Sequence, residues 1–222
     1  MALTIVTWLW GDAYTEAHVQ NLANACKRHM GEHRYVCFSD RDVPGVETII
    51  YQGRKFPNSL GWGKRGNCLR RLWLLSDEAR EALGDEIIML DIDSVLLGPI
   101  EVPQEDFKIW KCPSIGKHKI AYNPSVMFMR GDALPGLWDK FLAAPRKTWL
   151  AAKNAGWTGN DQAVISHHVH GMNVATWDER DGFFSFRDHG ERPPAHAKLV
   201  SFYGPYDPAK YLHLDWVAEN WR

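Results

Sequence analysis

The chain has 222 residues, a formal net charge of −1 and 45% hydrophobic residues, which together predict one soluble domain over residues 1–222. The near-neutral charge gives no basic field that would attract nucleic acid or an anionic membrane surface. We find no apolar stretch of transmembrane length, and the start MALTIVTWLW lacks the basic region of a signal peptide. Four cysteines lie without paired spacing, so we expect reduced thiols and a cytoplasmic location: Cys26, Cys37, Cys68 and Cys112.

The first half of the chain predicts strands alternating with helices. The β-branched run at 3–9 predicts a buried strand, and small or apolar residues at helical spacing predict a helix over 14–30. Further strands are predicted at 34–38, 46–51 and 86–90, with a loop over 52–63 and a helix over 64–75. Because EIIML at 86–90 is apolar throughout, we expect it to be buried on both faces of a parallel sheet.

The second half continues the same alternation. Strands are predicted at 107–111, 122–130 and 199–203, helices at 133–143 and 161–169, and a tail from Tyr211 that docks on the body. Strand–helix–strand spacing favours right-handed crossovers between parallel strands. The sequence therefore predicts an α/β fold, a mostly parallel twisted sheet with helices on both faces.

Two aspartates, Asp91 and Asp93, directly follow the apolar strand 86–90. Because strand side chains alternate, we expect the two to point the same way, a few ångströms apart, and to repel each other unless a cation or shared proton intervenes. The carboxyl ends of parallel strands are where open α/β sheets bind ligands, and carboxylates suit Mg²⁺ or Mn²⁺. The alternative is a pair of solvated acids at a strand end, with Asp93 capping a turn.

The run IIMLDIDSVLLGPI resembles the DxD segment of glycosyltransferases with the GT-A (nucleotide-diphospho-sugar transferase) fold. The resemblance is to the family 8 type in its compact bacterial and phage form, which uses nucleotide sugars and retains the anomeric configuration. Five more segments resemble that family in order: Trp62-Gly63-Lys64, Asn123 to Met129, Gly159 to Gln162, Ser185-Phe186-Arg187, and Ser201 to Pro208 with Gly204.

The resemblance implies a metal and cations at the diphosphate of the donor. Asp91 and Asp93 would hold Mn²⁺ or Mg²⁺, and Lys64 and Arg187 would contact the diphosphate. Charge that develops on a leaving diphosphate has to be neutralised, and a metal with basic side chains can do this. These residues would therefore assist departure of a nucleoside diphosphate, most plausibly UDP.

The resemblance also implies residues for the sugar and the base. Asn123 would line the donor sugar, Asp161 would bind its hydroxyls, and Gln162 would lie under the anomeric carbon as a catalytic group. The end of the first strand, with Thr7 and Trp8, would meet the nucleobase, and Tyr14 would stack on it; Gly204 belongs to the late substrate-binding segment. The acceptor is a hydroxyl of a glycan, lipid or protein that the sequence does not identify.

The chain departs from the family pattern at a late histidine that binds metal and a lysine near the phosphate. Ser201 stands at the histidine and Asp207 at the lysine, while Tyr203 stands where compact members often have histidine. A serine hydroxyl is a poor metal ligand beside imidazole. Two other interpretations stay open: a phosphatase of the haloacid dehalogenase type, with Asp91 as nucleophile and Asp93 as acid/base, or a nucleotide-sugar or glycan binder without catalysis.

Overall fold

The structure is a computed structural model that describes residues 3–50, 63–111 and 121–222, and their side chains except those of 63–67. The predicted loop, Trp62 and Cys112 lie outside the described residues. The described chain divides into two compact units. We call residues 3–50, 88–102 and 177–222 the N-terminal unit, and residues 63–87 and 103–176 the central unit.

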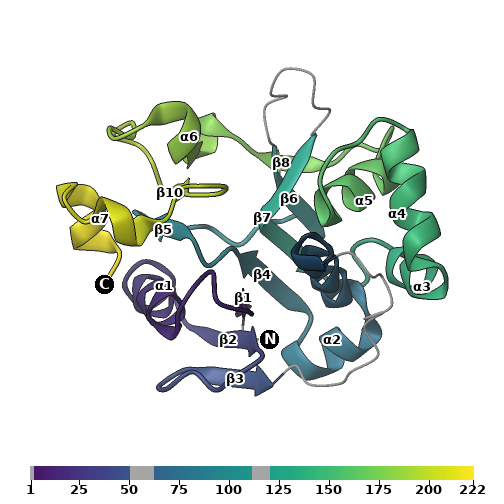
Figure 1. Cartoon of the computed structure of the whole chain (residues 1–222), viewed down its shortest axis with the longest axis horizontal. Helices are drawn as coiled ribbons and strands as arrows, with labels where there is room; N and C mark the ends of the chain where they lie inside the picture. Colours follow the sequence, from purple (N-terminus) through teal and green to yellow (C-terminus); the bar gives the residue numbers. More distant parts are fainter. Residues whose placement is uncertain (1–2, 51–62, 112–120) are drawn as a thin grey trace. The chain divides into compact units, whose positions relative to one another are not determined.

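The main sheet has seven strands in the order β3-β2-β1-β4-β7-β6-β8 (Figure 1). Strands β1, β2 and β3 pair in parallel, and β6 pairs antiparallel to β7 with a register shift at Ile109 and Trp110. The bounds are β1 Leu3–Leu9, β2 His33–Ser39, β3 Glu47–Ile50, β4 Glu86–Leu90, β6 Phe107–Lys111, β7 Tyr122–Arg130 and β8 Ala175–Trp177. The predicted α/β class with a mostly parallel sheet is therefore confirmed, and the architecture is compatible with a Rossmann-like fold.

A smaller sheet belongs to the N-terminal unit. It has the order β5-β10-β9, with β10 antiparallel to β5 and parallel to β9. The bounds are β5 Ser94–Leu96, β9 Phe183–Ser185 and β10 Leu199–Ser201. Strand β10 ends at Ser201, two residues earlier than predicted. The N–H of Phe202 still donates to the carbonyl of Asp93, and Gly204 then turns the chain at φ +83°.

The core of the N-terminal unit forms around β1 and helix α1 (Glu16–His29). Every residue of β1 is buried, and α1 buries Leu22, Ala25 and Cys26 of its predicted stripe, whereas Ala17 is exposed. The tail docks as predicted: α7 (Asp215–Asn220) lies beside α1 in Figure 1, and Arg28 donates to the carbonyls of Asn220 and Arg222. Three short helices complete this unit: η3 Glu179–Asp181, α6 Phe186–His189 and η4 Pro208–Tyr211.

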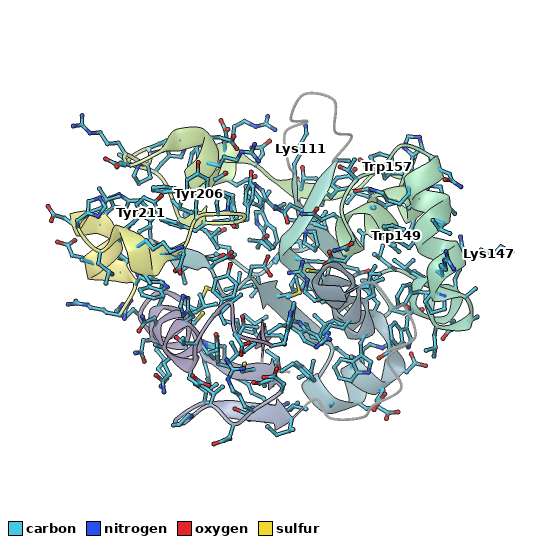
Figure 2. The ribbon with its side chains drawn as sticks, viewed as in Figure 1. Lys111, Lys147, Trp149, Trp157, Tyr206 and Tyr211 are labelled. Carbon is cyan, nitrogen blue, oxygen red and sulfur yellow. The ribbon has the colours of Figure 1, made fainter. Side chains whose placement is uncertain are left out.

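Aromatic residues form a buried cluster in the C-terminal segment of this unit. Phe186 stacks on Phe202 with ring centroids 4.2 Å apart, and Tyr206 and Tyr211 pack against Phe186 (Figure 2). Val217 and Trp221 of the tail join the same buried cluster. Several of the chain's aromatic residues therefore serve packing, as is usual for large rings.

The helices of the central unit form one group, in which α5 packs against β7. Helices α3 (Leu137–Ala143), α4 (Pro145–Asn154) and α5 (Asp161–His168) lie beside one another in the green part of Figure 1. The unit also contains η2 (Gly63–Leu75) and α2 (Asp77–Leu83), whose first turn is capped by the Ser76 hydroxyl. In the described ranges, no helix has the length and apolar character needed to cross a bilayer.

Some predicted elements differ from those found. The predicted α-helix over 64–75 is the 3₁₀ helix η2. The helix predicted from residue 133 begins only at Leu137, because Gly136 adopts the left-handed conformation at φ +69°. The predictions for 3–9, 86–90, 107–111 and 122–130 are confirmed to the residue.

Candidate functional site

Asp91 and Asp93 lie in a turn between β4 and β5. Strand β4 ends at Leu90, and the N–H of Ser94 donates to the carbonyl of Asp91 over 3.1 Å, which closes the turn. The expectation that a continuing strand aligns the two side chains is therefore wrong, because strand alternation does not extend into a turn. Asp93 is buried, with 6% of its surface exposed, and Asp91 is half-buried.

Tyr14 is the hydrogen-bond donor to this acidic turn. Its hydroxyl donates to Oδ2 of Asp93 over 2.6 Å. Burial raises the pKa of Tyr14 far above its ordinary value, and the negative charges of Asp93, Asp91 and Asp207 raise it further. A protonated phenol thus faces three carboxylates, and we call Tyr14, Asp91, Asp93 and Asp207 the acidic cluster.

His18 connects the acidic cluster to the start of α1. The backbone N–H of Thr15 donates to Nδ1 of His18 over 3.2 Å, so Nδ1 is an acceptor and Nε2 carries the proton. Nε2 then donates to Oδ1 of Asp207 over 3.1 Å. Sequence reasoning missed His18, since its helix-start position indicates a cap and its aspartate partner is 189 positions away.

The Asp207 carboxylate accepts hydrogen bonds that a lysine side chain at this position could not accept. Besides His18, its Oδ1 accepts the N–H of Ala209 over 2.9 Å and so caps η4. Trp221 packs edge-on against the His18 ring at 5.0 Å. Asp207 therefore takes part in a part-buried aspartate–histidine contact.

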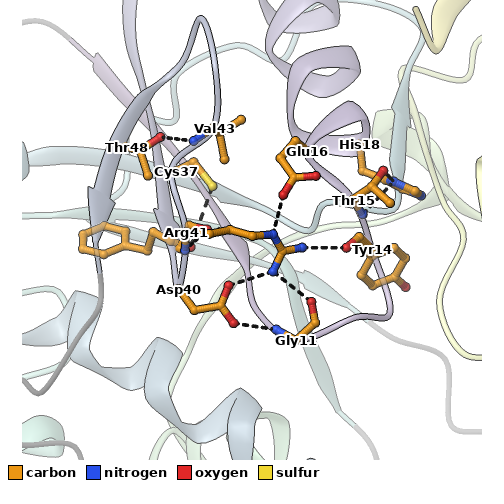
Figure 3. Close-up of polar contacts among 12 residues, drawn as sticks. Gly11, Tyr14, Thr15, Glu16, His18, Cys37, Asp40, Arg41, Val43 and Thr48 are labelled. Carbon is orange, nitrogen blue, oxygen red and sulfur yellow. Dashed lines mark hydrogen bonds and ion pairs between the residues drawn. The ribbon is translucent and has the colours of Figure 1, made fainter.

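The loop between β1 and α1 is held by Arg41, as Figure 3 shows. The guanidinium donates to the carbonyls of Gly11 and Tyr14, each over 3.0 Å, and pairs with Glu16 and Asp40. Asp40 in turn accepts the N–H of Gly11 over 2.8 Å. We call these five residues the Arg41 network; because it holds both Gly11 and Tyr14, it fixes the loop that carries the phenol of the acidic cluster.

Thr7 and Trp8 are core residues of β1. Their exposed fractions are 0% and 5%, and Trp8 stacks on Phe38 with ring centroids 4.7 Å apart. The predicted contact of these two residues with a nucleobase gains no support from this packing. The ring of Tyr14, predicted to stack on the base, packs edge-on against His18 at 5.1 Å.

The late segment and the basic element also lie in the N-terminal unit. Arg187 is exposed on α6, whose first turn is capped by the Ser185 hydroxyl. Gly204 is exposed in the turn that follows β10, and Tyr203 is half-buried. Lys64 begins the η2 segment, and its side chain lies outside the described part of the structure.

Ser201 is fully enclosed within the smaller sheet. It pairs with Ser94 on one side and Ser185 on the other, so three buried serines form a row across β5, β10 and β9. The hydroxyls of Ser201 and Ser94 have no hydrogen-bond partner among the described residues. A side chain with 0% exposure is poorly placed to bind a metal, so a third ligand would have to be another group or water.

Asp161 in the central unit forms a buried ion pair with Arg71. Nε of Arg71 donates to Oδ2 of Asp161 over 2.7 Å, and the two side chains are 8% and 2% exposed. Asp161 begins α5, where a negative charge is also favoured by the helix dipole. Sequence reasoning identified Asp161 but missed Arg71, one of two adjacent arginines in η2 with no local signal to distinguish it.

Gln162 and Asn123 are brought together in the same unit. Nε2 of Gln162 donates to Oδ1 of Asn123 over 3.1 Å. Asn123 is 3% exposed on β7, whereas Gln162 is half-buried at the start of α5. Two residues from separate predicted motifs, 39 positions apart, therefore make direct contact.

The acidic turn fits a hard divalent cation by the chemistry of its donors. Asp91 and Asp93 supply carboxylate oxygens, which Mg²⁺ and Mn²⁺ prefer, and such ions commonly take their remaining ligands from phosphate and water. Across 3–50, 63–111 and 121–222, no group of three His, Cys, Asp or Glu side chains is arranged to hold a metal.

No protein-family model matches this chain, and no curated protein matches it. The α/β architecture defines a broad structural class that hosts many unrelated functions. The function therefore has to be argued from the acidic cluster, the Arg71–Asp161 pair and the Gln162–Asn123 contact.

Proposed function

We propose that this protein is a retaining glycosyltransferase that moves a hexose from a nucleotide sugar, most plausibly a UDP-sugar, to a hydroxyl acceptor with help from a divalent metal. The observation that carries the proposal is the acidic turn after β4, where Asp91 and Asp93 follow a buried strand and Tyr14 donates to Asp93. The order of the motifs along the chain, which resembles GT-A glycosyltransferases of family 8, supports the same reaction class.

The acidic turn takes the diphosphate end of the donor in this proposal. Asp91 and Asp93 would hold Mn²⁺ or Mg²⁺, which when bound neutralises charge developing on the leaving diphosphate. Tyr14 keeps its proton because its pKa is raised, so it donates to Asp93 and orients that carboxylate. Arg187, exposed on α6, and Lys64 are the cations assigned to the diphosphate oxygens.

The roles at the donor sugar are assigned to Asp161 and Gln162. Asp161 pairs with Arg71, and its carboxylate would accept hydrogen bonds from sugar hydroxyls. Gln162 provides an amide oxygen that can stabilise positive character at the anomeric carbon, since glycosyl transfer passes through an oxocarbenium-like transition state.

Binding and turnover of nucleotide sugars test the proposal directly. The protein would be titrated calorimetrically with UDP, GDP, CMP and dTDP and with their sugars, with Mn²⁺ or with EDTA. We expect one nucleotide to bind in a metal-dependent way. If the enzyme retains configuration, NMR of the first released sugar should show the same anomeric configuration as the donor. Failure of every nucleotide to bind would refute the proposal, and turnover of p-nitrophenyl phosphate would favour the phosphatase.

A nucleotide-sugar binder without catalysis is the second candidate. The burial of Ser201 and the engagement of Asp207 by His18 favour it, because neither residue supplies the ligand or cation found at those positions in the resembling family. A binder would take up the nucleotide sugar stoichiometrically and release neither free hexose nor a transfer product over long incubation with Mn²⁺.

A further inference from the structure

The amide group of Gln162 contacts Asn123 on one side and Gly159 on the other, all within the central unit. The two ends of a side-chain amide have opposite roles, since the nitrogen donates and the oxygen accepts. The chemistry assigned to Gln162 requires the oxygen. Asn123 and Gly159 can determine whether the nitrogen or the oxygen of this amide is presented to a ligand.

The orientation of Asn123 is fixed by Ser125. The backbone N–H of Ser125 donates to Oδ1 of Asn123 over 3.0 Å, and the Ser125 hydroxyl bonds to the same oxygen over 2.9 Å. A backbone N–H can only donate, so the atom that it contacts must be the amide oxygen of Asn123. Asn123 is also 3% exposed, which leaves water little access to compete.

The orientation of Gln162 follows from that of Asn123. Because Oδ1 of Asn123 is an acceptor, the group that contacts it over 3.1 Å must be the donating nitrogen Nε2 of Gln162. The oxygen Oε1 is then turned away from Asn123. The reversed amide would place two oxygens against each other, and two acceptors in contact repel.

Gly159 leaves room for that oxygen. A Cβ added at Gly159 would overlap Oε1 of Gln162 and would lie only 3.2 Å from its Cβ. Gly159 also has φ +91°, and its carbonyl accepts the indole N–H of Trp149 over 3.2 Å, a residue labelled on α4 in Figure 2. Because Gly159 has no side chain and its backbone is anchored, Oε1 keeps the space that a Cβ at this position would occupy.

We propose that Ser125, Asn123 and Gly159 are positioning residues that hold the Gln162 amide in one orientation, with Oε1 presented to the donor sugar. The proposal deepens the function proposed above and rests on it for the identity of the ligand. The geometric part concerns the free protein and needs no ligand. Loss of the orientation should lower kcat rather than donor affinity, because small displacements of a reacting group cost far more in rate than in binding.

The orientation can be read from the side-chain amide resonances of Gln162 by ¹⁵N NMR of the free protein. The chain has four glutamines, so the Gln162 pair is assigned by its loss in Gln162→Met. We expect two separated proton resonances, one of them protected from exchange with water. Asn123→Leu should collapse the pair toward free-glutamine positions, whereas Asn123→Asp, which keeps an accepting oxygen, should preserve it.

Two glycines provide a matched comparison that does not rely on Asn123. Gly159 and Gly171 have φ +91° and +86°, but an added Cβ contacts Gln162 only at 159 and meets nothing within 4 Å at 171. Gly159→Ala and Gly171→Ala should therefore share a similar backbone penalty. Only Gly159→Ala should shift the Gln162 resonances and lower kcat, by about 10²-fold, with the donor Kd unchanged.

The outcomes separate this inference from the proposed function. An unchanged Gln162 amide in both Asn123→Leu and Gly159→Ala, or a wild-type pair at free-glutamine positions, overturns the positioning role whether or not the protein is an enzyme. If the resonances respond as expected but no nucleotide sugar is bound or consumed, the orientation stands and the proposed function fails. If Asn123→Leu does not fold, Gly159→Ala against Gly171→Ala decides alone.

Discussion

The hydroxyl of Tyr14 donates a 2.6 Å hydrogen bond to the carboxylate of Asp93, although 79 positions separate the two residues. The bond joins the β1–α1 loop to the turn after β4, so the acidic pair is held by a residue from another part of the N-terminal unit. A neutral phenol in contact with a carboxylate stabilises it without adding charge. Burial and the charges of Asp93, Asp91 and Asp207 raise the pKa of Tyr14, so the phenol keeps its proton.

Tyr14→Phe removes this donor and keeps the ring. We expect the free energy of unfolding at neutral pH to fall by about 1–3 kcal/mol, the typical value for a hydrogen bond to a charged group. The measurement is urea unfolding at pH 7 without metal, with Tyr211→Phe, a half-buried ring of the aromatic cluster, as control. A loss no larger than that of the control would contradict a stabilising Tyr14–Asp93 bond.

The same substitution should change the dependence of stability on alkaline pH. The folded-state pKa of Tyr14 is raised, so the stability from this group is fully present below pH 10 and is lost as pH rises further. An unfolded tyrosine releases its proton near a pKa of about 10, so wild type should lose about 1.4 kcal/mol per pH unit relative to Tyr14→Phe above that pH. Unfolding series at pH 9, 10 and 11 measure the difference, and parallel curves would contradict the prediction.

Arg41 should determine the order of the β1–α1 loop. Arg41→Gln removes the donors to the carbonyls of Gly11 and Tyr14 and the ion pairs with Glu16 and Asp40. We expect a stability loss of about 1–3 kcal/mol and faster amide exchange at 11–15, because the two carbonyls lose charged donors.

Arg34→Gln is the matched control, since Arg34 pairs with Glu47 and both side chains are more exposed. An exposed pair of this kind contributes about 0–1 kcal/mol. Equal losses for Arg41→Gln and Arg34→Gln, with unchanged exchange in the loop, would mean that Arg41 is an ordinary surface arginine.

The fold was predictable where a strand is long enough to show a pattern. Strands β1, β4, β6 and β7 have the predicted bounds, and each has five to nine residues. Strands β5, β8 and β9 have three residues each, too few to show a period. Their existence depends on pairing partners far along the chain.

The candidate site was predictable only in its acids and amides. Asp93 and Asp161 are visible as short motifs, but their partners Tyr14 and Arg71 lie 79 and 90 positions away. No local pattern marks an arginine that will be buried against a distant carboxylate. The turn at Asp91 was missed for a similar reason: the apolar run predicts where β4 is buried but does not specify the backbone geometry beyond its end.

Asp93→Asn tests the metal proposed for the acidic turn. The substitution removes one carboxylate charge but leaves an oxygen that can accept the Tyr14 hydroxyl, so we expect the protein to fold. Catalysis should fall by about 10²-fold or more, as expected when a charge-stabilising group is lost. Nucleotide affinity should fall with Mn²⁺ present and change little with EDTA.

Asp106→Asn, at a side chain that is 76% exposed and distant in sequence from the acidic turn, is the control for removing a negative charge. It should leave metal-dependent binding unchanged. An Asp93→Asn protein that unfolds, while its folded fraction retains metal-dependent nucleotide binding, would show that the aspartate is structural and would refute the metal assignment.

The Arg71–Asp161 pair can be tested by a double-mutant cycle on stability. Arg71→Met should cost about 3–5 kcal/mol, because it leaves the Asp161 carboxylate, only 2% exposed, without its cation. Arg71→Met combined with Asp161→Leu should recover much of this loss, since two apolar side chains in a buried position carry no unpaired charge. Urea unfolding of the four proteins gives the coupling energy, and a strictly additive cycle would contradict direct pairing.

The double variant Arg71→Met with Asp161→Leu should nevertheless lose donor-sugar binding, because it lacks the Asp161 carboxylate that accepts the sugar hydroxyls. Retained sugar binding in that variant would assign the buried pair to folding alone.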